Sequence, residues 1–196
     1  MKVFSRLYDL ALKWAAHHHA PFYLGGLSFA ESSFFPVPPD VMLAPMVLTR
    51  RDKAWAYAGL TTLTSVLGGI AGYFIGMYSF EIVVPVLREM HLWSDEGFVR
   101  VQEWFREWGF WAILIAGFTP IPYKIFTITS GAIAMAFLPF VLASTIGRGA
   151  RFFLVAGVIR VGGERMEKIL RQYIDTIGWL MVVLVVLLYF VVSCGN

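Results

Sequence analysis

The chain has 196 residues, of which 58% are hydrophobic and only 15% are charged, and its mean hydropathy is +0.68. Since soluble domains carry about a quarter charged residues, this composition indicates an integral membrane protein. The net charge of +3 comes from short basic clusters between apolar runs, which suit anionic lipid headgroups better than nucleic acid, and the single cysteine, Cys194, excludes an intrachain disulfide.

The first predicted element is an amphipathic helix over residues 1–20, lying on the membrane surface. Its apolar stripe is weak, and an ordinary polar linker fits these residues equally well. The run His17-His18-His19 places three adjacent imidazoles around a helix, where they do not face one point, so no metal site is predicted.

Residues 22–48 are long and apolar but are broken by Pro36, Pro38 and Pro39. Each proline removes a backbone donor and pushes its predecessor out of the helical region, so together they end a helix rather than bend it. Within a bilayer such a break is tolerated only where protein or water surrounds it. We therefore expect a re-entrant helical hairpin with these prolines at its tip. A kinked full span is the alternative.

Two carboxylates flank this break, Glu31 before it and Asp40 after it. Ionisable groups within membrane segments are expensive and are functional candidates by default. A carboxylate balanced between desolvation and a neighbouring cation can load and release a proton, so Glu31 and Asp40 are predicted to couple transport to protons. In the structural alternative, Glu31 clamps the hairpin and Asp40 N-caps the returning helix.

Residues 54–78 form the first unbroken apolar run, and it is long enough to cross a hydrocarbon core of ~30 Å. Gly68, Gly72 and Gly76 recur every four residues within it. They form a small-residue face that lets another helix approach closely. This pattern predicts packing and says nothing about a substrate.

Residues 79–108 carry an apolar stripe of helical period with charges opposite it, which predicts a second surface helix. Residues 109–136 then repeat the broken pattern, with Pro120 and Pro122 at the tip of a second re-entrant hairpin. Lys124 follows that break and is predicted to help hold an anionic lipid headgroup.

Residues 138–159 form the next unbroken span, and within it Arg148 and Arg151 lie three residues apart on one helix face. Guanidinium groups match the geometry of phosphate, so the two arginines are predicted to bind the phosphate of a lipid headgroup. The alternative is a salt bridge to Glu31 or Asp40 that holds the fold.

A third amphipathic surface helix is expected over 160–175, and a C-terminal transmembrane helix over the uncharged residues 176–193. The fold class predicted for the whole chain, 1–196, is therefore a single all-α integral membrane domain.

An internal repeat supports this organisation. The order surface helix, broken segment, unbroken span occurs over 1–78 and again over 92–159, and Pro36-Val37-Pro38 matches Pro120-Ile121-Pro122. Paired interrupted segments point to a transporter binding site at the repeat interface. An odd number of crossings between the two hairpins predicts that the repeats are inverted.

The two repeats carry opposite charges, Asp40 and Lys124, at the same place after the second proline, which suggests that these two side chains face each other. The distribution of basic residues gives the same inside excess for hairpins and for full spans, so it does not decide between them.

Several of these residues resemble a known family. Glu31, Pro36-Val37-Pro38 and Asp40, followed by the glycines of the first span, resemble the DedA membrane proteins, also called the SNARE-associated or VTT-domain superfamily. The run from Gly117 to Ile128, with Ser130-Gly131-Ala132, is similar to its YqaA-like branch. The resemblance covers about residues 20–160.

This resemblance implies a multi-pass protein of the bacterial inner membrane with two opposed re-entrant hairpins. It also implies proton-dependent movement of lipids such as undecaprenyl phosphate or phosphatidylethanolamine between leaflets, with Glu31 and Asp40 matching the family's acidic residues. The main branch carries two arginines beside the proline of its second hairpin. Phe118 and Tyr123 stand at those positions here, and we infer that Arg148 and Arg151 take over anion binding.

The predicted function is a proton-coupled transporter, or flippase, of a phosphate-bearing lipid, with membrane lipids, an anionic headgroup and protons as its partners. No catalytic residue, metal, cofactor or nucleic-acid partner is expected, and the protein is not predicted to be an enzyme. The alternatives are a transporter of small solutes or ions, a proton antiporter, and a non-transporting membrane scaffold. Homo-oligomerisation is left open.

Overall fold

The computed structural model describes residues 17–33, 38–89, 95–119 and 123–163, and within these ranges every element is helical. The predictions for 176–193, for Pro36, Pro120 and Pro122, and for most of 1–20 and 160–175 lie outside the described residues. The elements are α2 (Ala20–Ser33), α3 (Asp40–Thr49), the short 3-10 helix η1 (Arg51–Lys53), α4 (Ala54–Glu89), α5 (Asp95–Phe118), α6 (Tyr123–Ala132) and an unlabelled helix, Phe137–Gly163.

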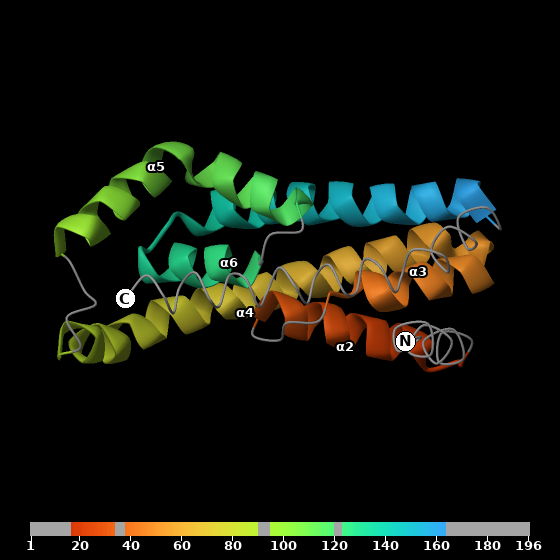
Figure 1. Cartoon of the computed structure of the whole chain (residues 1–196), viewed down its shortest axis with the longest axis horizontal. Coiled ribbons are helices and arrows are strands. Elements are labelled where there is room, and N and C mark those ends of the chain that lie inside the picture. The colour runs from red at the N-terminus through yellow and green to blue at the C-terminus, as the bar shows by residue number, and fades with distance from the viewer. Residues whose placement is uncertain (1–16, 34–37, 90–94, 120–122, 164–196) are drawn as a thin grey trace, which may run out of the picture.

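Two long helices, α4 and Phe137–Gly163, form the axis of the structure (Figure 1). They run in opposite directions, because Trp55 stacks on Phe153 while Tyr73 contacts Phe140. The stretch Arg51–Phe80, which includes most of α4, and the helix Phe137–Gly163 are both long and apolar enough to cross a membrane. The all-helical fold and these two apolar helices agree with the predicted class.

The first broken segment turns back on itself beside α4. Ser28 of α2 contacts Thr61, and Ser33 contacts Gly68, so α2 and α4 run in the same direction. Helix α3 then leads the chain back, so that the start of α4 lies beside the start of α2. Ala20 and Ala54 accordingly pack in one apolar cluster.

The second broken segment has the same arrangement with the opposite direction. Leu114 of α5 lies against Gly147 and Gly117 against Arg148, so α5 runs along the Phe137–Gly163 helix in its direction. Helix α6 then returns along α4 (Figure 1). As a result Ser33, before the first break, contacts α4 at Gly68, and Thr119, before the second break, contacts the other long helix at Arg151, with α2 and α5 approaching from opposite ends of the molecule.

Two helix boundaries differ from the predicted ones. Helix α4 continues past residue 78 to Glu89, and α5 runs without interruption from Asp95 through the predicted boundary at 108 to Phe118. The predicted boundaries followed changes in hydropathy. Backbone hydrogen bonds do not depend on hydropathy, so a helix can extend beyond its apolar stretch.

The glycine face of α4 lies against both broken segments. A Cβ atom at Gly68 would overlap the carbonyl oxygen of Phe29 in α2, and one at Gly76 would overlap that of Ile128 in α6. Backbone-to-backbone approach of this kind is possible only for glycine at these positions. The small residues therefore set how deeply α2 and α6 pack against α4.

We predict that Gly76→Ala destabilises the protein by roughly 1–3 kcal/mol, because the backbone of α6 must move away. Gly59→Ala is the matched control, since a Cβ there meets nothing within 4 Å and alanine is the better helix former. Thermal unfolding of the purified protein in detergent measures both variants. Equal unfolding midpoints would contradict the packing described here.

Candidate functional site

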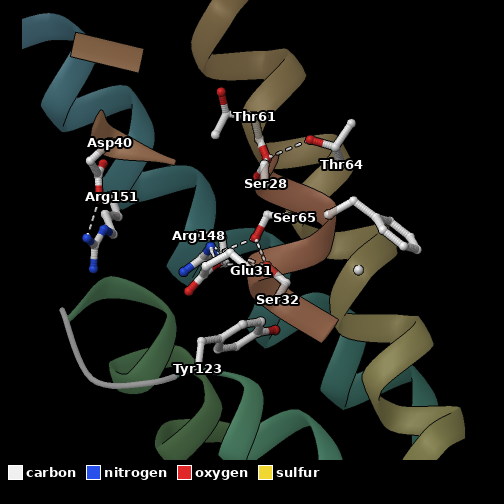
Figure 2. A network of polar contacts seen from close by, with 12 residues as sticks. Ser28, Glu31, Ser32, Asp40, Thr61, Thr64, Ser65, Tyr123, Arg148 and Arg151 are labelled. Carbon is white, nitrogen blue, oxygen red and sulfur yellow. Dashed lines mark hydrogen bonds and ion pairs between the residues drawn. The ribbon is translucent and has the colours of Figure 1, made fainter. Parts of the chain in front are cut away.

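The structure brings four of the predicted site residues together as two ion pairs, here called the charged quartet: Glu31, Asp40, Arg148 and Arg151. Nη2 of Arg148 donates to Oε2 of Glu31, and Nη2 of Arg151 donates to Oδ2 of Asp40 at 2.5 Å. Both arginines belong to the Phe137–Gly163 helix, and both carboxylates to the first broken segment (Figure 2). The salt-bridge alternative for the arginines is therefore present in the structure.

Arg148 is the most enclosed member, with only 3% of its side chain exposed. Its Nε donates to Ser65 Oγ at 2.5 Å, and its Nη2 reaches Ser32 Oγ at 3.3 Å. Its guanidinium carbon lies 4.9 Å from the ring centre of Tyr123 and 4.7 Å from that of Phe152. Hydrogen bonds, aromatic faces and a carboxylate together compensate the lost hydration of this cation.

A row of hydroxyl groups joins α2 to α4 beside Arg148. Ser28 Oγ donates to the carbonyl of Thr61 at 2.8 Å, and Ser32 Oγ lies 2.8 Å from Ser65 Oγ. Sequence analysis missed these residues. The available signal was their spacing, since serines and threonines four residues apart on two apolar helices are suited to bonding across a helix interface.

Arg151 has a looser environment that involves both breaks. Its Nη1 donates to the carbonyl of Thr119 at 2.6 Å, at the end of α5 before the second break, while Asp40 follows the first break. The two side chains are 17% and 25% exposed. Oδ1 of Asp40 is buried and has no hydrogen-bond partner among the residues that the structure describes. Arg151 thus links the two broken segments.

Tyr123 was not predicted as a site residue. It begins α6, is fully buried, and donates its hydroxyl to Ser144 Oγ on the Phe137–Gly163 helix. Its ring lies beside the Arg148 guanidinium (Figure 2). The signal in the sequence was its place directly after the second break.

The suggested Asp40–Lys124 pair and the alternative N-cap role of Asp40 both differ from the structure. Its carboxylate pairs with Arg151 and not with Lys124, because Arg151 of the Phe137–Gly163 helix contacts both Asp40 after the first break and the Thr119 carbonyl before the second. Asp40 also does not cap α3: Pro39 occupies the N-cap position and no side chain caps the helix. Lys124 is half-buried on α6, and within the described ranges its side chain makes no ion pair.

Of the predicted tip residues that the structure describes, Pro38 is exposed and Pro39 is buried just before α3.

The quartet as a whole carries two positive and two negative formal charges, so its sum is zero. It lies between apolar helices, where little water is available to solvate a charge. Removing one member therefore leaves the charge of its partner uncompensated.

A helical architecture with two helices long and apolar enough to cross a membrane is typical of an integral membrane protein. The VTT domain matches residues 37–161, and the chain belongs to this family, the DedA or SNARE-associated proteins. A protein of Haemophilus influenzae and one of Histophilus somni are each 42% identical over 98% of this chain and 100% of their own length. A protein of Methanocaldococcus jannaschii is 24% identical over 66% of this chain and 77% of its own. No solved structure gives a significant match.

We predict that Glu31→Gln lowers the free energy of unfolding by about 3 kcal/mol, because it leaves the Arg148 charge buried without a counter-charge. The control is Glu96→Gln, which removes the exposed partner of Arg100 and should change stability by less than ~0.5 kcal/mol. Reversible denaturation in mixed micelles measures both. A Glu31→Gln protein as stable as the control would contradict a structural role for this pair.

Proposed function

We propose that the protein is a DedA-type transporter that moves a phosphate-bearing lipid between the leaflets of the bacterial inner membrane and couples this movement to protons. The observation that carries the proposal is the charged quartet. Ionisable groups between apolar membrane helices cost free energy to bury, and for that reason they indicate a functional site by default. Its position, where both broken segments approach the middle of the long helices, is suited to a translocation site.

In this proposal the two broken segments are re-entrant hairpins that enter the membrane from opposite sides, as inverted repeats. The opposite directions of the two segments along α4 and the Phe137–Gly163 helix support this arrangement. So does the return of the first segment to the end at which it began, where Ala20 and Ala54 pack together. The chain would cross the membrane several times, and the breaks would be sheltered by protein.

Arg148, Arg151 and Lys124 are the groups that would hold the anionic headgroup. A guanidinium presents a planar fork of donors that matches phosphate oxygens. Undecaprenyl phosphate and phospholipids such as phosphatidylethanolamine fit this chemistry, and the resemblance to the DedA family favours them. Family membership also favours a transporter over an enzyme.

Glu31 and Asp40 would carry the protons. Each carboxylate now pairs with the arginine that would bind phosphate, so headgroup and carboxylate compete for the same cation. A carboxylate released from its arginine in a dry environment favours the protonated form. This competition gives a physical link between substrate binding and proton uptake.

The functional test uses the purified protein in vesicles with a fluorescent phospholipid whose leaflet is read by an impermeant quencher. Wild-type protein should exchange the lipid between leaflets, and Arg151→Ala should slow exchange by about tenfold or more through loss of a charged hydrogen-bond donor. Arg100→Ala, which removes an arginine exposed over 80% of its side chain, is the matched control and should exchange normally.

Equal exchange in protein-free, wild-type and Arg151→Ala vesicles would contradict lipid transport and favour a solute transporter or a scaffold. Arg151→Lys, which keeps the charge and loses the fork, guards against a variant that fails to fold. Size-exclusion chromatography checks each protein before reconstitution.

The topology has its own test in a Cys194→Ser background. Hairpins place residue 52 on the same side as residue 17 and residue 96 on the other side, whereas full spans exchange the sides of 52 and 96. With the N-terminus inside, an impermeant thiol reagent added to intact cells should label Glu96→Cys and not Asp52→Cys. The reverse labelling pattern would contradict the hairpins.

A further inference from the structure

We propose that Asp40 and Arg151 form the exchangeable pair of the quartet, and that a phosphate headgroup replaces Asp40 on Arg151 while Asp40 takes up a proton. A proton then accompanies each negative charge of the lipid, so transport of an anionic phospholipid moves no net charge. This inference rests on the proposed function and assigns its coupling to one carboxylate.

The two ion pairs differ in how firmly they are held. Arg148 uses Nε on Ser65 and Nη2 on Glu31 and Ser32, and it lies beside the rings of Tyr123 and Phe152. An incoming phosphate would have to displace Glu31 from a guanidinium that is 3% exposed and fixed by three helices. Arg148 with Glu31 is therefore the anchor that positions the site.

Fewer described hydrogen bonds hold the Asp40–Arg151 pair than hold Arg148 with Glu31. Oδ2 of Asp40 accepts from Arg151, whereas Oδ1 is buried without a hydrogen-bond partner among the described residues. Among the described residues, the Thr119 carbonyl is the other hydrogen-bond partner of Arg151, and both side chains of the pair are several-fold more exposed than Arg148. A phosphate oxygen that replaces Oδ2 breaks one hydrogen bond and forms one.

The charges around Asp40 explain why a proton must follow. The Phe137–Gly163 helix presents Arg151 and Arg148, α2 presents Glu31, and α6 presents Tyr123 and, one residue on, Lys124. Helix α4 has no ionisable side chain from residue 58 to residue 72. Lys124 is half-buried on α6 and is not a member of the quartet. The quartet sums to zero, so a singly charged phosphate bound at Arg151 would give the quartet and the phosphate together a sum of minus one among apolar helices.

Protonation of Asp40 restores that sum. The proton comes from the aqueous side on which the lipid enters and binds a carboxylate oxygen of Asp40. It leaves from the opposite side when the phosphate departs and Asp40 pairs with Arg151 again. No covalent bond of the lipid changes.

The test uses the full-length protein in vesicles with acyl-chain-labelled phosphatidylglycerol, which carries one negative charge. One arm applies a pH difference of one unit with the potential held at zero by potassium and valinomycin. The other applies a potassium diffusion potential at equal pH. We expect the first arm to enrich the label in the leaflet on the alkaline side, approaching about tenfold, and the second arm to shift nothing.

A leaflet shift driven by the potential alone would overturn the inference, because the cycle would then carry charge. Exchange that ignores the pH difference would also overturn it while leaving lipid transport intact. No exchange above protein-free vesicles would remove the proposed function together with this inference.

Asp40→Asn tests directly whether Asp40 carries the proton. It cannot take up the proton, so its exchange should lose the pH response and respond to the potential instead. Glu96→Gln, which changes an exposed carboxylate outside the site, is the matched control and should keep the pH response of the wild type. A pH response retained in Asp40→Asn would show that another group carries the proton, and the two wild-type arms decide the inference if either variant does not fold.

Discussion

The structure depends on the burial of one cation. A guanidinium keeps its proton in proteins, so Arg148 must find charge and hydrogen bonds wherever it is enclosed. Glu31 and Ser32 of α2 and Ser65 of α4 supply them, and the aromatic ring of Tyr123 in α6 lies beside the guanidinium. A single side chain of the Phe137–Gly163 helix thereby contacts both broken segments and the other long helix, and the glycine face of α4 lets these elements approach closely enough to do so.

The Arg148–Glu31 pair also positions the second ion pair. Arg151 lies one helical turn further along the same helix and connects the two breaks through Asp40 and Thr119. Arg148 is almost fully enclosed, whereas Arg151 and Asp40 are partly exposed, so in the proposed exchange the first pair stays fixed while the second changes its partner. A device that must bind and release an anion within a membrane needs both, since a fully saturated site cannot exchange partners and a fully open one cannot hold charge out of water.

The sequence predicted the parts of the site better than their connections. Apolar runs and proline breaks indicated where the helices lie, and charges within apolar segments identified all four members of the quartet. A salt bridge from the arginines to Glu31 or Asp40 was one of the two alternatives. Which arginine pairs with which carboxylate could not be predicted, because it depends on the register of helices more than a hundred residues apart. Tyr123 and the hydroxyl row were missed because such residues are common in apolar helices, and only the packing shows which of them are buried.

The coupling between Glu31 and Arg148 tests this account most directly. It is measured by a double-mutant cycle on the free energy of unfolding with Glu31→Gln, Arg148→Gln and the double variant. If each buried charge stabilises the protein only when its partner is present, the double variant should be more stable than the sum of the single effects predicts, by about 1 kcal/mol or more. Strictly additive effects would mean that the pair does not hold the broken segment to the long helix, and the central claim would be wrong.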